Sequence, residues 1–356
     1  MTHRPFDHPT RTEAYAFVVV DDEGNAGGRV TPQEGVTISC SSTSPVARHI
    51  PSMVLPPSEV RDLNPDVDRI QVWVNINGGE YPLGVYAITT PTAHVRHGRR
   101  WREMQLHDLG VLLSGDDTLP EAFGVASGDR VTDAIEVLLD RAGVARRDVV
   151  ATLQTAGNHL AWPPTVQPAT PMRALTALAG LTFPWFDVDG VCQVGWLPYA
   201  GLAAPRYDFS LGKAAVVDVG DLSETDDRWG IPTEWRVRSK AQNGALISAL
   251  YQLPSSHPMS SAARGGRRRQ RDVPIPGLES TDDAKARARD AAQRETAVHR
   301  TRSFRARLIP TLEPHDVVTY VDGTPMLLDQ WTVTCVPGAL MDVTLRESLI
   351  EESSLS

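Results

Sequence analysis

Histidine is the side chain best suited to chemistry near neutral pH, and several histidines of this sequence have suggestive neighbours. His94 and His97 could together hold a metal ion. His107-Asp108 and Asn158-His159 could each belong to a catalytic group. On a strand, however, residues i and i+3 point to opposite faces, and no third ligand follows closely in the sequence. We therefore expect no metal site, and we interpret the histidines as ordinary surface or core residues.

Sequence motifs of the common catalytic classes are absent. The chain contains no Gly-x-Ser-x-Gly, no His-Glu-x-x-His and no Walker loop. Because any two carboxylates can meet in space, the sequence leaves open a carboxylate pair for sugar cleavage. We expect a protein that is not an enzyme and that uses no cofactor and no metal.

The most unusual local feature is an arginine-rich segment, Arg264-Gly-Gly-Arg-Arg-Arg-Gln-Arg. Three interpretations are open: a solvated loop, a DNA contact, or a partner contact made by Arg264, Arg267, Arg268, Arg269 and Arg271. Acidic residues that could pair with it across a subunit boundary are Asp221, Glu224, Asp226 and Asp227. An exposed ion pair of this kind would contribute less than about 1 kcal/mol.

Composition places the chain among ordinary globular proteins. Its 356 residues are 41% hydrophobic and 22% charged, and this length is typical of two or three domains. Gly and Pro, 27 residues each, favour a turn-rich and strand-rich architecture. The net charge of −9 disfavours tight binding of nucleic acid over the whole surface.

The sequence also bears on membrane insertion, export and the state of the cysteines. No apolar window of about 18 residues exists, so we expect no membrane span. The polar start of the chain lacks the apolar core of a signal peptide, which indicates synthesis in a cytoplasm. Cys40, Cys192 and Cys335 each lie in an apolar, strand-like run, and we expect them to be buried free thiols.

Alternating apolar residues predict a first β domain over 12–113. The expected strands cover 13–20, 36–41, 70–76, 81–89 and 101–113, with a hairpin turn at Asn77-Gly78-Gly79 and an irregular edge at 51–57. Strands joined by such short turns form one antiparallel barrel or sandwich. Residues 1–11 are expected to be flexible.

The pattern changes over 114–204 to that of an α+β insert. One helix is expected near Asp129, with Gly143 at its C-terminal cap. A second is expected to begin at Thr170-Pro171, with Thr170 as N-cap, and to end before Gly180. Asp189-Gly190 then predicts a hairpin between 182–188 and 191–197.

Strand patterns return over 205–253 and 301–348, which we expect to form a second β domain. Its predicted strands cover 215–219, 234–238, 246–251, 304–309, 317–321, 326–336 and 341–345, with a turn at Asp322-Gly323. A loop and helix insert, 254–300, interrupts this domain, with the helix over 281–300. Residues 349–356 form a tail.

The order of these elements resembles the baseplate hub and tail-tip hub family of long-tailed bacteriophages, which is related to the hub half of type VI secretion spike proteins. The stretches that carry the resemblance are Tyr81-Pro-Leu-Gly-Val-Tyr-Ala-Ile-Thr-Thr, Gly128-Asp-Arg-Val-Thr-Asp-Ala-Ile-Glu-Val-Leu-Leu, Pro171-Met-Arg-Ala-Leu-Thr-Ala-Leu-Ala, Phe186-Asp-Val-Asp-Gly and Pro310-Thr-Leu-Glu-Pro-His-Asp-Val-Val-Thr-Tyr-Val. In the last of these, His315 stands where the family usually has Gly.

The resemblance implies a fold class that is mainly β, with two tube-type β-barrel or sandwich domains plus an inserted domain. It also implies a homotrimeric hub at the virion tail tip, made in the host bacterial cytoplasm, linking a sixfold tail tube to threefold tip parts. The implied partners are its own copies, a distal tail or tail tube protein, a tip or spike protein and the C-terminus of the tape measure. DNA would pass through without specific binding. The alternatives are a sixfold distal tail protein and a tail-associated cell-wall hydrolase.

Overall fold

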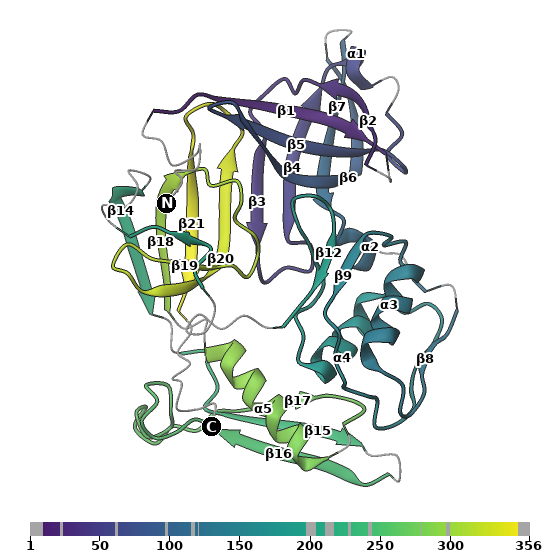
Figure 1. The fold of residues 1–356 in the computed structure, drawn as a ribbon, viewed down its shortest axis with the longest axis vertical. Helices are drawn as coiled ribbons and strands as arrows, with labels where there is room; N and C mark the ends of the chain where they lie inside the picture. Colours follow the sequence, from purple (N-terminus) through teal and green to yellow (C-terminus); the bar gives the residue numbers. More distant parts are fainter. Residues whose placement is uncertain are drawn as a thin grey trace.

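A computed structural model shows a long curled sheet with smaller α+β units below it (Figure 1). The structure describes residues 10–21, 24–60, 63–96, 99–114, 118–119, 121–196, 204–210, 217–226, 229–240, 244–278, 280–296 and 300–347. The main sheet has 13 strands, and its continuous path runs β14-β18-β21-β20-β3-β4-β7-β6-β5-β1-β2. The remaining strands, β19 and β13, attach beside β20.

The first half of the sheet comes from the start of the chain. Its strands are β1 (Glu13–Val20), β2 (Ala26–Val30), β3 (Thr37–Ser41), β4 (Arg48–Leu55), β5 (Arg69–Ile76), β6 (Gly79–Arg96) and β7 (Arg99–Asp108), with the short helix α1 (Pro57–Val60) after β4. The hairpin predicted at Asn77-Gly78 is confirmed, because both residues have positive φ and β5 pairs directly with β6.

Within 51–57, predicted as an irregular edge, residues 51–55 instead form most of β4, and Pro57 begins α1. The prolines in this stretch suggested a broken strand. In the structure, Pro51 falls within a register shift between Ile50 and Met53, where the ladder tolerates a residue without an N–H. The strand therefore continues past the proline.

The second half of the sheet comes from the end of the chain. Its strands are β13 (Tyr207–Asp208), β14 (Val217–Asp226), β18 (Arg300–Arg307), β19 (Val317–Thr319), β20 (Pro325–Thr334) and β21 (Leu340–Arg346). The turn predicted at Asp322-Gly323 is confirmed between β19 and β20, and Gly323 has a φ of 91°.

The two halves repeat one arrangement of strands. The first half has the order β3-β4-β7-β6-β5, and the second has β14-β18-β21-β20-β19. Counterparts follow each other identically along the chain, and every neighbouring pair is antiparallel in both halves. In both, the fourth strand in chain order, β6 or β20, shifts register against its hairpin partner. The similarity ends at the outermost strand, because β1 pairs antiparallel with β5 whereas β13 pairs parallel with β19.

The halves are joined directly, without a linker, where β3 pairs with β20 from Ser41–Gln330 to Thr37–Thr334. A single apolar cluster runs beneath both. It includes Ile38 and Ile50 from the first half and Trp331 and Val343 from the second, all at most 3% exposed. The predicted fold class, mainly β with an α+β insert, is confirmed.

The α+β insert packs beside the first half. Its elements are α2 (Val111–Ser114), β8 (Phe123–Val125), α3 (Val131–Arg141), β9 (Arg147–Val149), β10 (Leu160–Trp162), α4 (Ala169–Ala179), β11 (Trp185–Phe186) and β12 (Cys192–Val194). The hairpin at Asp189-Gly190 and the left-handed C-cap at Gly180 are confirmed. The predicted N-cap at Thr170 is wrong. The helix α4 already includes Ala169, and Pro168 precedes it without a side-chain cap.

A further unit combines the sheet β16-β15-β17 with helix α5 (Figure 1). Its strands are β15 (Glu234–Lys240), β16 (Leu246–Gln252) and β17 (Gln270–Pro274), and the helix is α5 (Thr281–Thr296). We expected 234–238 and 246–251 in the second β domain, but these strands leave the main sheet. Their apolar side chains, among them Trp235 and Val237, join Ala288 and Leu178 in the core of the α+β insert. The predicted helix start at Thr281 is confirmed.

Arg11, within the segment expected to be flexible, donates through both Nη atoms to the carbonyl of Leu308 at 3.0 Å. Residues 1–9 and the predicted tail 349–356 lie outside the described residues. Among the described residues, no helix is long and apolar enough to cross a membrane.

Candidate functional site

A fully buried arginine marks the point where three parts of the chain meet. Arg48 on β4 has no exposed surface, and its Nη2 forms an ion pair with Glu313, in the loop between β18 and β19. Its Nη1 donates to the carbonyl oxygen of Phe186, on the hairpin of the insert, at 2.5 Å. One guanidinium thus joins the first half of the sheet, the second half and the insert.

The acids around Arg48 are tied down by backbone groups. The backbone N–H of Arg48 donates to Asp108 at 2.6 Å, and the N–H of Gly110 donates to the same carboxylate at 3.0 Å. The N–H of Val188 donates to Glu313 at 3.1 Å. A buried charge is costly unless it is paired and hydrogen-bonded. Glu313 pairs the guanidinium and backbone groups bond the acids, while Arg48 Nε has no hydrogen-bond partner among the described residues.

Burial sets the protonation of this junction. It raises the pKa of Asp108 to about 6, although backbone hydrogen bonds oppose the shift. Burial also raises the pKa of Asp316 to about 6, and it raises the pKa of Glu313 against the pull of Arg48. For Arg48 itself, burial alone would lower the pKa, but Glu313 outweighs it, so the guanidinium stays charged. The cluster has the character of a structural clamp.

His315 lies beside this junction, at the position where the family usually has Gly. Its φ is 69°, a left-handed conformation that glycine adopts at little cost. The backbone therefore has here the conformation that a glycine would favour, although the residue carries a side chain. Burial lowers the pKa of His315 to about 4, with a smaller contribution from Arg346. Its Nδ1 has no hydrogen-bond partner in the part of the chain that the structure describes, and its ring meets Trp185 edge-on at 6.4 Å.

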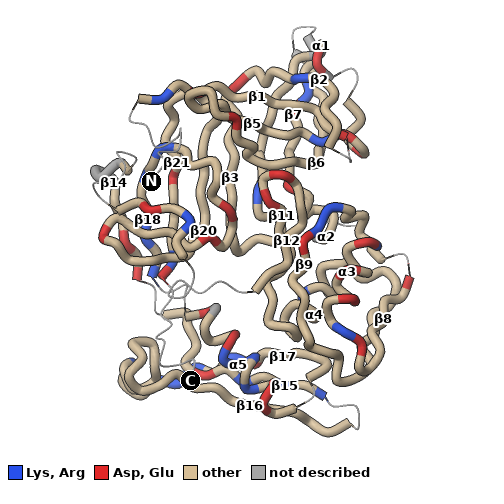
Figure 2. Tube along the Cα trace, viewed as in Figure 1, with Lys and Arg blue, Asp and Glu red and all other residues tan. Residues whose placement is uncertain are grey.

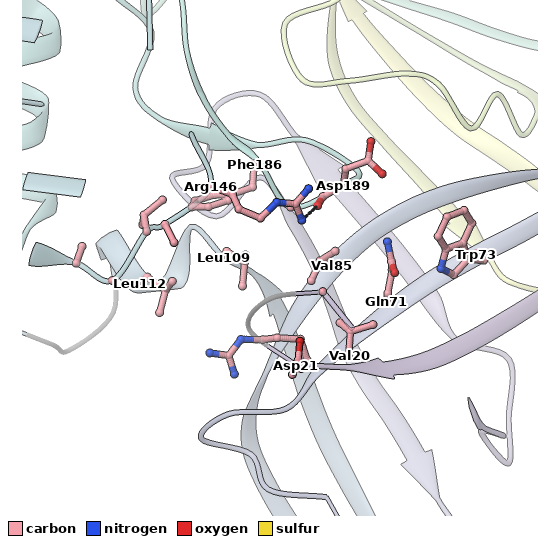
Figure 3. A pocket seen from close by; sticks show the side chains of 17 residues that line it. Val20, Asp21, Gln71, Trp73, Val85, Leu109, Leu112, Arg146, Phe186 and Asp189 are labelled. Carbon is pink, nitrogen blue, oxygen red and sulfur yellow. Dashed lines mark hydrogen bonds between the residues drawn. The ribbon is translucent and has the colours of Figure 1, made fainter. Parts of the chain in front are cut away.

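A cavity of about 870 Å³ opens between the first half of the sheet and the insert (Figure 3). Its lining combines Trp73 and Gln71 of β5 with Arg146 and Asp189 of the insert, and Arg146 donates to the carbonyl oxygen of Asp189 at 2.8 Å. The described lining contains no serine, threonine, cysteine or histidine. It therefore offers neither a hydroxyl or thiol nucleophile nor an imidazole base to a ligand held there.

The arginine-rich segment contacts its own chain. Arg264 donates to the carbonyl of Ile231 at 2.7 Å, and Arg269 donates to that of Trp229 at 2.9 Å. The Arg267 guanidinium lies over the Trp229 ring, 4.2 Å from its centre.

Two further arginines of the segment approach acids. Arg268 lies 3.7 Å from Glu234, and Arg271 lies 3.2 Å from Glu295 on α5. Figure 2 shows acidic and basic residues side by side along α5 and the strands next to it. The side chains of Arg268 and Arg271 are still 73% and 58% exposed, so a contact with another protein stays a prediction.

One of the acidic residues suggested as partners of the segment, Glu224, is engaged elsewhere. Glu224 on β14 pairs with Arg300 at 2.8 Å and with Arg302 at 3.5 Å, both on the neighbouring strand β18. Asp227 lies outside the described residues, and nothing is described of the Asp221 side chain.

The remaining sequence candidates are spread over the molecule. His94 contacts Glu103 at 3.1 Å and stacks on Trp101, while His97 lies outside the described residues. His107 accepts or donates a hydrogen bond with Thr89 at 2.8 Å. No group of three potential metal ligands occurs within the described ranges.

Two more sequence predictions concern the insert and the cysteines. Asn158 donates to the carbonyl oxygen of Lys240 at 2.7 Å, and the neighbouring His159 is exposed. The three cysteines are buried free thiols, as predicted.

Sequence reasoning missed the Arg48–Glu313 junction. The two residues are 265 positions apart, and nothing near either one marks it as a partner of the other. The one available signal was an isolated arginine within an apolar strand, since a buried charge must find a partner.

Comparison with solved structures places this architecture. A tail protein from Neisseria meningitidis MC58 superposes with a TM-score of 0.65 and 16% identity, over 94% of this chain and 97% of that chain. A 43 kDa tail protein of prophage MuSo2 from Shewanella oneidensis superposes with 0.61 and 12%, over 93% and 98%. The chain has the fold of phage tail proteins.

The tail-protein fold extends to secretion machinery. The Escherichia coli c3393 protein, a type VI secretion component with structural similarity to the T4 tail proteins gp27 and gp5, superposes with a TM-score of 0.51 and 10% identity, over 96% of this chain and 75% of that chain. No family model and no curated protein sequence matches this chain. These comparisons confirm the predicted resemblance at the level of the fold. Sequence identities this low show a shared fold and nothing finer.

Proposed function

We propose that this chain is a structural protein of a phage tail and that three copies form a hub at the tail tip. The observation that carries the proposal is the repeated arrangement of strands in the two halves of the sheet. Three chains with two such halves each would give a ring of six similar units. A ring of this kind fits a sixfold tail tube on one side and threefold tip parts on the other.

The same ring would surround the path of the DNA. The implied neighbours are a distal tail or tail tube protein, a tip or spike protein and the C-terminus of the tape measure. The net charge of −9 on each copy supports passage without retention, because a surface that makes few phosphate contacts releases few counterions.

The copy number and symmetry of the purified full-length protein test this proposal. Light scattering should give three times the chain mass of 38.8 kDa, and class averages in electron microscopy should show a threefold ring with a central channel. Six copies with true sixfold symmetry would favour the distal tail protein. A single copy at all concentrations would refute the ring.

We also propose that the role is not catalytic. The lining of the 870 Å³ cavity supports this for acyl transfer, because it lacks a hydroxyl or thiol nucleophile and an imidazole base. Its carboxylates, Asp21 and Asp189, are of the type that a sugar-cleaving enzyme uses, so the test is made on cell walls. Purified protein should leave isolated bacterial cell walls turbid, with a commercial lysozyme as positive control. Clearing of the walls above the buffer control would favour the tail-associated hydrolase instead.

A further inference from the structure

Several backbone edges of the main sheet are paired on one side only among the described residues, and two of them, β14 and the end of β6, match a join inside the chain. The sheet path ends at β14, which pairs with β18 on one side only. On β6, the pairing with β5 ends at Ala87, while the strand runs on to Arg96, paired only with β7. Figure 1 shows β14 and β6 at opposite sides of the sheet. Unpaired edges invite a strand from another chain.

The join between the two halves supplies a template for these edges. Within the chain, β3 pairs with the part of β20 that runs beyond β19. In the repeated arrangement, β6 is the counterpart of β20 and β14 is the counterpart of β3. The part of β6 beyond β5 is thus equivalent to a surface that is already occupied inside the chain, and β14 is equivalent to the strand that occupies it.

We propose that β14 of one copy pairs antiparallel with the end of β6 in the next copy. This inference rests on the proposed ring and names the contact that closes it. Each join between copies would then repeat the β3–β20 join within a copy, so that all six halves meet in similar ways.

The matched pairs in the two halves fix the register of β6. Ile88 faces Leu106 in the first half, as Leu328 faces Leu345 in the second. Both β6 and β20 contain a bulge after these pairs. Counting across it along each strand, Thr92 of β6 corresponds to Thr332 of β20.

The register of β14 follows in the same way. Ile50 faces Leu106 on β7, as Arg302 faces Leu345 on β21. Through the pairs Ser39–His49 and Thr225–Thr301, Thr225 then corresponds to Ser39.

Inside the chain, Thr332 donates from Oγ1 to Ser39 Oγ at 3.2 Å. The proposed register places Thr92 opposite Thr225 of the next copy, so two hydroxyl side chains face each other again. Both threonines are exposed in the single chain.

Exposed apolar residues agree with this register. Val95 on β6 is 65% exposed and Leu222 on β14 is 42% exposed. The register places them opposite each other. Their counterparts within the chain are Cys335 and Val36, which are joined by a backbone hydrogen bond of 2.7 Å and are 8% and 2% exposed.

The charges of the two segments are complementary. The sequence of β14, Val-Asp-Val-Gly-Asp-Leu-Ser-Glu-Thr-Asp, is acidic and has no basic residue. The hairpin end of β6 and β7 carries the arginines Arg96, Arg99, Arg100 and Arg102. Opposite net charges on the two segments favour this pairing over a contact between two copies of the same edge.

A disulfide trap tests the register. The double variant Thr92→Cys with Thr225→Cys, mildly oxidised, should give a covalent three-copy species on a non-reducing gel. The two edges lie on opposite sides of six intervening strands, roughly 30 Å apart along the sheet, so a bond within one copy cannot form. An equal mixture of the two single variants should give a two-copy species, and each single variant alone should give none.

The matched control moves one cysteine by one position. Ala93→Cys with Thr225→Cys places the two thiols on opposite faces of the sheet and should not cross-link. Light scattering on the same samples separates the outcomes. A three-copy mass without the Thr92–Thr225 bond overturns this edge pairing and leaves the ring standing. A bonded assembly of six copies supports the pairing and overturns the trimer. A one-copy mass overturns both.

Discussion

Replacing Arg48 by methionine is the most direct test of the buried junction. The substitution keeps the volume of the side chain but removes the partner of Glu313 and the donor to the Phe186 carbonyl. Breaking a buried ion pair from one side typically costs about 3–5 kcal/mol, because a charge is left without compensation. Burial already raises the pKa of Glu313, so part of this cost is avoided by protonation, and we expect about 3 kcal/mol for Arg48→Met at pH 7.

Urea unfolding followed by tryptophan fluorescence measures this loss as a decrease in the free energy of unfolding. Two comparisons check the reasoning. Adding Glu313→Leu should restore part of the stability, since an apolar pair replaces an unpaired carboxylate. Lowering the pH should narrow the gap in the free energy of unfolding between Arg48→Met and the native protein, because burial without Arg48 favours the neutral form of Glu313 in the variant. A loss below about 1 kcal/mol, or a double variant as unstable as the sum of both singles, would refute the junction as a clamp.

Three further outcomes follow from features outside this pair. Burial lowers the pKa of His315 to about 4, so as the pH falls the unfolded chain takes up the proton at a higher pH than the native protein does. The free energy of unfolding should therefore decrease by up to roughly 3 kcal/mol between pH 6.5 and pH 4. His315→Asn should lack that component, as seen in chemical unfolding at several pH values; parallel curves would contradict it. Gly190→Ala should cost about 1–2 kcal/mol in thermal unfolding, because Gly190 has a φ of 72° and an added Cβ would lie 3.1 Å from Val85, whereas Gly195→Ala, in open space, should be neutral. Finally, a gel shift at about 150 mM salt should show no retained DNA duplex, because the arginine-rich segment is engaged with its own chain; retention would reopen the DNA interpretation.

Local signals in the sequence predicted local structure well. The turns at Asn77-Gly78, Asp189-Gly190 and Asp322-Gly323 need only a few neighbouring residues, and each appears where it was expected. Alternation also found the strands of 234–251 but assigned them to the wrong sheet, because a period of two says which residues form a strand and not which strand lies beside it. The resemblance supplied the overall order of elements, which no single motif carried.

The parts of the site that could not be predicted depend on long-range contacts. Along the chain, two insertions and most of the strands of the main sheet separate Arg48 from Glu313. The two side chains meet only once all of these have folded. The arginine-rich segment looked like a free loop because its partners, Trp229 and Glu295, lie far from it in sequence. At His315, where the resemblance expects Gly, the sequence left the turn geometry open; the structure gives a left-handed φ of 69° and, among the described residues, no hydrogen-bond partner for Nδ1.

The direct pairing of β3 with β20 has a mechanical consequence. A backbone ladder and a shared apolar core connect the two halves, so among the described residues the two halves are held together as one body. A motion of one half away from the other would expose buried side chains such as Ile38 and Trp331 to water. If the proposed ring exists, any widening of it would therefore have to take place where separate copies meet or where the smaller units attach.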